Sequence, residues 1–203
     1  YNDGGRGSRV YYVGKPATIE TNCEATSRFL DVMAFASEAD RTNAVGAALT
    51  VMLRNHWPGA KPMIAVTSSK SHGGKDTIIE FAGGRTPRAS LSYERQDWAL
   101  QKNFASMVHH NPDLGMINIE NVRLQGKGDS LASCFLERFV TDAEPVIFST
   151  GTGSPNRRKN DIVIATSTNF GKISEDLLNR SLPIHLEPVG DVASRRSPIG
   201  NPK

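Results

Sequence analysis

A lysine that follows two glycines is the residue of this chain best suited to binding phosphate. The segment Ser69–Asp76 reads Ser-Lys-Ser-His-Gly-Gly-Lys-Asp, and it separates an apolar run, residues 63–67, from residues 76–81, which can open a helix. The β-branched residues of the apolar run favour a buried strand. Glycines allow backbone N–H groups to turn toward a phosphate, and a helix N-terminus adds partial positive charge. Lys75 would then neutralise the β- and γ-phosphates of a nucleotide.

This loop departs at two positions from the phosphate-binding pattern G-x-x-x-x-G-K-S/T. Ser69 stands where the first glycine is expected, and Asp76 stands where a hydroxyl would bind Mg²⁺. A carboxylate can itself ligate Mg²⁺, but it sets a negative charge beside the phosphates. Thr77 comes one residue late and would need a shifted loop. The alternative interpretation is a Gly-Gly turn followed by a solvated lysine.

Polar residues at the ends of two other expected strands could meet this loop. Residues 114–121 predict a short strand that ends in Glu120 and Asn121, and residues 161–166 predict a strand that runs on to Asn169. Parallel strands present their carboxyl ends at one edge of a sheet, where ligands bind. Glu120 would hold Mg²⁺ directly or through water, Asn121 would orient an attacking water, and Asn169 would bind a γ-phosphate or that water. The alternative is that these strands simply end in polar residues.

Basic residues supply candidates for contacts with other molecules. Arg157, Arg158 and Lys159 lie on an expected loop, residues 151–160, and three consecutive cations can contact a nucleic-acid backbone. A solvated turn can carry the same charges, and the sequence does not separate these two readings. Arg180 lies at an exposed corner between a short helix and the last strand, from which a guanidinium could reach a phosphate on a neighbouring molecule.

Length and composition indicate one domain that needs no disulfide or metal to fold. A chain of 203 residues buries roughly 70% of its unfolded surface, and the formal net charge of +3 weakly favours anionic partners. Cys23 and Cys134 have no CxxC motif and no histidine at ligand spacing, which favours a reducing compartment. No apolar run approaches about 18 residues and no signal-like start is present, so we expect a soluble, cytoplasmic protein without membrane contact. The chain starts at Tyr1 and can be a piece of a longer protein.

The remaining elements follow from hydrophobic periodicity and capping residues. We expect a hairpin over residues 10–20, helices over 23–35, 37–56, 94–109, 129–140 and 174–180, and strands over 89–93, 145–150 and 181–186. Three of the helices are expected to bury the following residues: Val45, Ala48, Leu49, Met52, Leu53 and His56 in the second; Trp98, Leu100, Phe104 and Val108 in the third; and Leu131, Ala132, Phe135, Leu136 and Phe139 in the fourth. The segment from Glu187 to Lys203 is rich in Pro, Gly, Ser and Arg, which predicts a disordered tail.

The order of these motifs resembles the AAA+ ATPase domain, especially that of primase-helicases and replication ATPases of phages, plasmids and other mobile elements, close to the superfamily 3 helicases. The similarity covers about residues 35–188. Asp40-Arg41-Thr42-Asn43-Ala44 is similar to the start of the helix before the P-loop strand in that group. Ile119-Glu120-Asn121-Val122-Arg123 resembles its Walker B segment, with Glu120 in the aspartate place. Ser154-Pro155-Asn156-Arg157 followed by Ile164-Ala165-Thr166-Ser167-Thr168-Asn169 resembles the approach to sensor 1, and Asp176-Leu177-Leu178-Asn179-Arg180 resembles the arginine-finger corner.

The resemblance implies an α/β fold of the P-loop NTPase, AAA+-like kind, with three αβα layers and a mainly parallel central sheet. The helical lid that many AAA+ proteins carry after the last strand is not evident within these 203 residues. The implied organisation is an N-terminal hairpin and helix over residues 1–36, an ATPase core over 37–188 and a flexible tail over 189–203. Implied cofactors and partners are ATP, Mg²⁺, DNA and further copies of the chain in a hexameric ring. The implied site residues are Ser71, His72, Gly73, Gly74, Lys75, Asp76 and Thr77 for nucleotide, Asp76 and Glu120 for metal, Glu120, Asn121, Asn169 and Arg180 for catalysis, and Arg157, Arg158 and Lys159 for DNA.

The sequence is compatible with three functions. The first is an oligomeric ATPase of a DNA replication protein, a helicase or primase-helicase, in which Arg180 acts from the next subunit. The second is a degenerate AAA+ module that binds nucleotide or nothing and serves as a scaffold or switch, for which Ser69 and Asp76 are the evidence. The third is an unrelated α/β domain in which Gly73-Gly74-Lys75 is only a turn.

Overall fold

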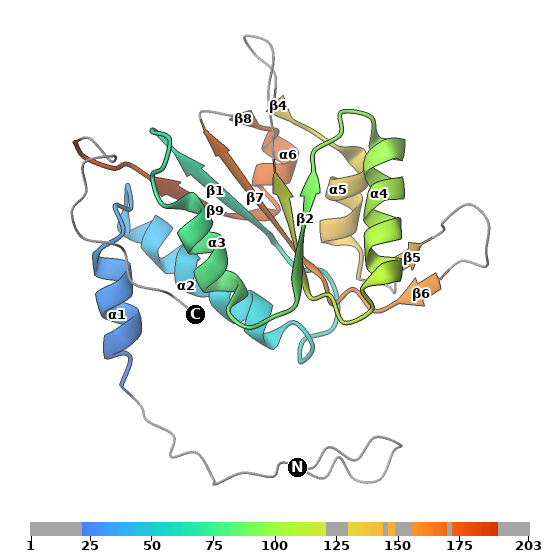
Figure 1. Ribbon diagram of the computed structural model, residues 1–203, viewed down its shortest axis with the longest axis horizontal. Coiled ribbons are helices and arrows are strands. Elements are labelled where there is room, and N and C mark those ends of the chain that lie inside the picture. Colours follow the sequence, from blue (N-terminus) through green and yellow to red (C-terminus); the bar gives the residue numbers. More distant parts are fainter. Residues whose placement is uncertain (1–21, 121–129, 144–145, 149–155, 170–171, 191–203) are drawn as a thin grey trace, which may run out of the picture.

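A five-stranded parallel sheet forms the centre of the computed structural model, which describes residues 22–120, 130–143, 146–148, 156–169 and 172–190 (Figure 1). Its strands are β1 (Met63–Ser68), β2 (Arg88–Ser92), β3 (Met116–Glu120), β7 (Val163–Asn169) and β9 (Ser181–Leu186). Their order across the sheet is β2-β3-β7-β1-β9, and all four neighbouring pairs are parallel. The carboxyl ends of all five strands therefore lie along one edge.

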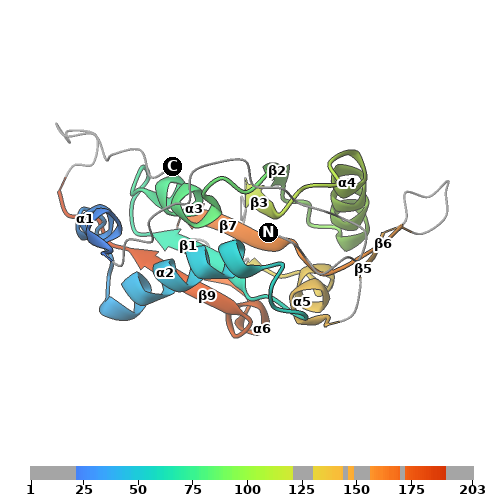
Figure 2. The same cartoon turned by 90° about the horizontal axis from the view of Figure 1, so that it is seen from below.

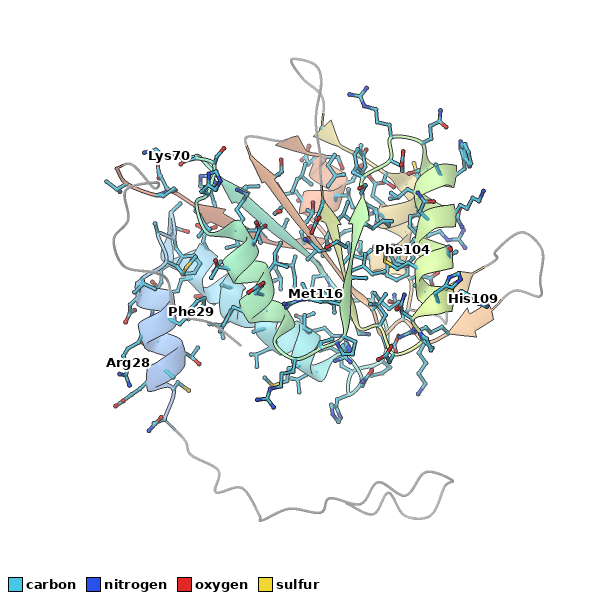
Figure 3. All side chains as sticks on the ribbon, in the orientation of Figure 1. Arg28, Phe29, Lys70, Phe104, His109 and Met116 are labelled. Atoms are coloured by element: carbon cyan, nitrogen blue, oxygen red, sulfur yellow. The ribbon has the colours of Figure 1, made fainter. Side chains whose placement is uncertain are left out.

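Helices cover both faces of this sheet (Figures 1 and 2). The helices α1 (Glu24–Asp31), α2 (Glu38–Leu53) and α3 (Lys75–Gly83) pack on one face, and α4 (Asp97–His110), α5 (Cys134–Thr141) and α6 (Glu175–Leu178) pack on the other. Each face has its own apolar core, and Figure 3 shows Met116 in the first and Phe104 in the second. The predicted three-layer αβα fold with a mainly parallel sheet is confirmed.

The strand β1 is buried on both faces, as its apolar run predicts. Ile64 and Val66 enter the core beneath α2 and α3, whereas Met63 and Ala65 enter the opposite core. Successive side chains of a strand point to opposite faces, so a strand covered on both sides needs apolar residues at every position. This burial fixes the place where β1 ends and the following loop begins.

The helix α2 begins as predicted but buries a different side. The Asp40 N–H donates to the Ser37 hydroxyl over 3.2 Å, which caps the helix. The residues facing the core are Ala44, Ala47, Thr50 and Val51, while Leu49, Met52 and Leu53 are 47%, 67% and 41% exposed. The predicted stripe is therefore wrong. Apolar residues surround most of this helix, and the small alanines allow the closer approach to the sheet, so periodicity alone does not select the buried side.

Two further predictions of helix packing need correction. In α4, Leu100, Phe104 and Val108 are buried as predicted, but Trp98 is 66% exposed and its indole N–H donates to the Gln96 side chain. The helix α5 starts at Cys134 instead of residue 129, because Ser133 caps it. The residues before the cap form the short strand β4 (Ser130–Leu131), which pairs with β8 (Lys172–Ile173). Leu131 is buried from this strand, and Ala132 is exposed.

The ends of the described chain also differ from the sequence prediction. The helix α1 stops at Asp31, and Phe35 then forms an antiparallel bridge with Leu186 beside the sheet. The predicted strand over 145–150 is β5 (Val146–Phe148), which pairs with β6 (Asn156–Arg158) and does not enter the central sheet. The predicted hairpin over 10–20 and the tail beyond residue 190 lie outside the described residues. In the ranges that are described, no helix is long and apolar enough to span a membrane.

Candidate nucleotide-binding site

The loop between β1 and α3 has a backbone that specifically requires its glycines. Gly74, immediately before α3, has a φ of 95°, and His72 has a φ of 58°, the one positive value among the non-glycine residues described. A Cβ atom on Gly73 would lie 2.2 Å from the Ser68 hydroxyl oxygen, which no side chain allows. Left-handed residues in such a loop turn backbone N–H groups inward and form a concave site for anions.

Ser69, in the place of the first expected glycine, fits this loop without strain. The φ angle of Ser69 is not positive, so its backbone conformation does not require glycine. Its N–H donates to the Leu186 carbonyl over 3.1 Å, which ties the start of the loop to the end of β9. The departure from the consensus at Ser69 therefore does not disturb the loop.

Lys75 is buried at the positive end of a helix. It is 8% exposed, and no side chain caps the N-terminus of α3. Burial lowers the pKa of the Lys75 ammonium, and the charge of Asp76 partly opposes that shift. An ammonium and a helix N-terminus both favour an anion, so a phosphate group fits the charge of this loop.

Asp76 lies next to β7. The Ser167 hydroxyl donates to Asp76 Oδ1 over 3.4 Å, and Ser167 itself pairs with Val66 of β1. Asp76 is exposed and Thr77 is half-buried. The carboxylate that replaces the expected loop hydroxyl is thus hydrogen-bonded to a hydroxyl from a neighbouring strand.

Glu120 occupies the carboxyl end of β3 and is held by two polar side chains. The Ser90 hydroxyl and the Asn118 amide N–H both donate to Glu120 Oε1, over 2.5 and 3.1 Å. The Asn118 Oδ1 atom is buried without a hydrogen-bond partner. With Oε1 bonded in this way, Oε2 is the oxygen left to face a cation or water.

Sheet order brings the predicted site residues to one edge. The strand β7 lies between β3 and β1, and its last residue, Asn169, pairs with Ser68, the residue before the loop. Glu120, the backbone of Asn169 and the loop from Ser71 to Thr77 therefore share the carboxyl edge of three adjacent strands. Asn121 lies outside the described residues.

Arg180 lies at the opposite end of the sheet. It immediately precedes β9, and its carbonyl accepts from the N–H of Met63, the first residue of β1, over 3.0 Å. The six residues of β1 span about 17 Å at roughly 3.3 Å per residue, and Lys75 lies beyond their far end. Arg180 and Lys75 of one chain therefore do not meet.

The basic residues predicted to bind DNA differ in their surroundings. Arg158 is 15% exposed at its side chain, donates to Asp161 over 2.8 Å and also donates to the Leu114 carbonyl over 2.5 Å. Lys159 is exposed, whereas the side chain of Arg157 lies outside the described part of β6. Figure 1 shows β5 and β6 far from the loop that follows β1. Arg158 is thus engaged within its own chain and is not a free cation.

Three residues near this edge carry no motif in the sequence that marks them as site residues: Ser90, Asn118 and Ser167. Each lies on the same face of the sheet as Glu120, as strand alternation requires, and two of them donate to Glu120 itself. Strand alternation within residues 114–121 already places Asn118 on the same face as Glu120. Ser90 and Ser167 become neighbours of this site only through the order of the strands, which the sequence does not state.

Comparison with known proteins supports the fold. No protein-family model matches the chain, and no curated protein sequence matches it. An X-ray structure of JCV helicase is similar, with a TM-score of 0.51 and 15% identity over 83% of this chain and 46% of that one. A JCV helicase structure with a bound thiazolopyridine–acetamide compound has a TM-score of 0.48 and 15% identity over 84% of this chain and 53% of that one. The chain spans about half the length of these helicase chains. Its fold is of the P-loop helicase kind.

Proposed function

We propose that this chain carries an ATP-binding, helicase-like domain of a DNA replication protein, as found in phages and other mobile elements, and that it hydrolyses ATP as an assembly of copies. The observation that carries the proposal is the glycine loop with buried Lys75, which opens on the same sheet edge as Glu120. We assign residues 37–188 to this ATPase core, with residues 1–36 and 189–203 outside it. The helix α1 packs on the core through a Phe29–Phe81 ring stack at 4.9 Å.

In this proposal the loop holds the nucleotide. Backbone N–H groups from Ser71 to Gly74 and the start of α3 surround the phosphates, and Lys75 neutralises their charge. Asp76 and Glu120 would hold Mg²⁺, since carboxylate oxygens are the protein ligands this ion prefers. When bound, the cation neutralises charge on the phosphate oxygens.

Hydrolysis would depend on positioning and electrostatics. Glu120 and Asn121 orient the attacking water, and Asn169 binds that water or the γ-phosphate. Arg180 stabilises charge developing on a γ-phosphate bound to a neighbouring copy. Its location at the far end of β1 supports this assignment, because it cannot reach the phosphates of its own chain.

DNA would contact basic residues in and just after β6. Lys159 and Arg157 remain the candidates, since Arg158 is bonded to Asp161 and Leu114. A ring of copies would place several such segments along one strand of DNA, and each phosphate contact adds to a salt-dependent affinity.

A module that binds nucleotide without hydrolysing it is the second candidate. Asp76 favours it, because a negative charge beside the γ-phosphate opposes binding of the triphosphate. The fold, of the P-loop helicase kind, argues against an unrelated domain in which the two glycines form only a turn.

The test is ATP binding and phosphate release by the purified protein, with and without Mg²⁺ and single-stranded DNA. Lys75→Ala is the test variant, and Lys102→Ala, which removes an exposed lysine of α4, is the matched control. We expect DNA-stimulated release that Lys75→Ala abolishes and Lys102→Ala retains. Nucleotide binding without release would favour the second candidate. Equal release by wild type and Lys75→Ala would refute the assignment.

A further inference from the structure

A hydroxyl from outside the phosphate loop contacts Asp76, the residue that replaces the expected loop hydroxyl. Asp76 stands in the position where a serine or threonine would ligate Mg²⁺. The hydroxyl bonded to Asp76 belongs to Ser167, 91 residues further along the chain. Ser167 lies two residues before the end of β7 (Val163–Asn169).

Ser167 occupies the centre of the proposed site. Within β7 it follows Thr166, which pairs with Ile119, so it lies level with Glu120 on the neighbouring strand. Its side chain shares a face with those of Val163 and Ala165, which pack in the core beneath α3. Neighbouring strands lie about 4.8 Å apart, so Ser167 separates Glu120 on β3 from β1 and the loop that follows it.

The chemistry of this contact suits a cation site. A serine O–H that donates to Asp76 Oδ1 restrains the carboxylate and leaves Oδ2 free to ligate a metal ion. Glu120 is restrained in the same way, since Ser90 and Asn118 both donate to its Oε1. In each carboxylate one oxygen accepts from neutral donors, and the other would be available to bind Mg²⁺, together with phosphate oxygens and water.

We infer that Ser167 is a positioning residue of the divalent-cation site, which orients Asp76 and so compensates for the hydroxyl absent from the loop. This inference rests on the proposed nucleotide-binding function and extends it. Ser167 acts through Asp76, so its effect should appear in the dependence on metal and not in the affinity for metal-free nucleotide.

The experiment measures binding of a fluorescent ATP analogue across a Mg²⁺ titration and in EDTA. Wild type, Ser167→Ala and Ser167→Thr are compared with Ser27→Ala, which removes an exposed serine of α1. We expect Ser167→Ala to raise the half-saturating Mg²⁺ concentration roughly threefold to tenfold, the scale of one ordinary hydrogen bond. Affinity in EDTA should remain within about twofold, and Ser167→Thr should restore the metal dependence, since it keeps the hydroxyl. Paramagnetic resonance of Mn²⁺ bound with the analogue gives a second, spectroscopic readout.

The outcomes separate this inference from the function on which it rests. Wild-type Mg²⁺ dependence that is unchanged in Ser167→Ala overturns the role of Ser167 and leaves nucleotide binding intact. Wild-type binding with no Mg²⁺ dependence also overturns it. A wild-type protein that binds no nucleotide refutes the proposed function, and the inference with it. Equal thermal stability of the variants excludes misfolding as the cause of an effect.

Discussion

The Met63 N–H donates to the Arg180 carbonyl over 3.0 Å, which places Arg180 at the amino end of β1 while Lys75 lies past its carboxyl end. Arg180 and Lys75 therefore lie at opposite ends of the same strand. In a head-to-tail assembly, the Arg180 side of one copy can face the Lys75 side of the next. If the chain assembles in this way, the proposed site would be shared between two copies.

A mixture of two inactive variants should recover activity. Arg180→Ala should bind nucleotide with wild-type affinity but lose turnover, and Lys75→Ala should lose binding. In a random one-to-one mixture, about one quarter of the head-to-tail interfaces would combine an intact loop with an intact Arg180. We expect phosphate release near that fraction of the wild-type rate. No recovery in mixtures shown by native mass spectrometry to contain both variants would contradict a shared site.

Replacing Lys75 should change stability with a defined pH dependence. Burial lowers the pKa of Lys75 in the folded protein below its unfolded value of 10.5. At pH values between the folded pKa and the unfolded pKa, the unfolded chain therefore binds more protons than the folded chain, and stability rises with pH. The burial cost is thus present at neutral pH and disappears as pH rises toward 10.5. Lys75→Met should be at least as stable as wild type at pH 7, with an advantage that shrinks at alkaline pH. Denaturant unfolding at pH 7 and pH 10 measures this, and an advantage that grows with pH would contradict it.

Gly73→Ala should damage the loop through a steric clash. The new Cβ atom would lie 2.2 Å from the Ser68 hydroxyl oxygen and 3.2 Å from the Lys70 carbonyl oxygen, so the Ser68 side chain must move and the loop has little room to adjust. We expect a loss of about 1–3 kcal/mol in the free energy of unfolding, together with loss of nucleotide affinity. Gly46→Ala, in the middle of α2, is the control. The Cβ atom added at this position would make only an ordinary 3.8 Å contact with the Leu182 side chain. That control should stabilise the protein by about 0.5–1 kcal/mol. Normal nucleotide binding by Gly73→Ala would show that the loop does not hold the phosphates.

Ser90→Ala tests the positioning of the Glu120 carboxylate, whereas Glu120→Gln removes the carboxylate itself. Losing one of the two donors to Oε1 should lower turnover roughly threefold to tenfold with little change in nucleotide affinity. Glu120→Gln should lower turnover by about a hundredfold or more, since it removes the carboxylate itself. Steady-state phosphate release compares the two variants. A larger loss in Ser90→Ala than in Glu120→Gln would contradict the assigned roles.

Replacing Arg158 should mainly lower stability, whereas replacing its neighbour Lys159 should mainly weaken DNA binding. Arg158→Ala removes the Asp161 ion pair and leaves the Leu114 carbonyl without this donor, so we expect about 1–3 kcal/mol of destabilisation. Lys159→Ala should change stability by less than about 0.5 kcal/mol. It should instead weaken single-stranded DNA binding and reduce the salt dependence of the affinity by about 0.7 in the log–log slope. Unchanged DNA affinity in Lys159→Ala would remove this residue from the interface.

The sequence predicted the elements with strong local signals. The apolar run of β1, the serine cap of α2 at Ser37 and the capped helix before β9 all appear where local chemistry placed them. Glycine and lysine spacing located the loop, because left-handed backbone and close approach leave few other residue choices at Gly73 and Gly74.

The failures arose where tertiary packing decides. Nothing local distinguishes the buried alanines of α2 from its exposed Leu49 and Met52, since both sides are apolar. Arg158 and Lys159 are chemically alike in sequence, and only the fold gives Arg158 its partners. Ser167 was hidden for the same reason, because its contact with Asp76 depends on the placement of β7 beside β1.

The most direct test of the central claim is calorimetric titration of ATP and Mg²⁺ into the wild-type protein and Lys75→Ala. We expect one nucleotide per chain in wild type and at least about a tenfold loss of affinity in the variant, or 1.4 kcal/mol, once the ammonium is gone. Equal affinity in the two proteins, or no binding by folded wild type, would contradict a phosphate site at this loop.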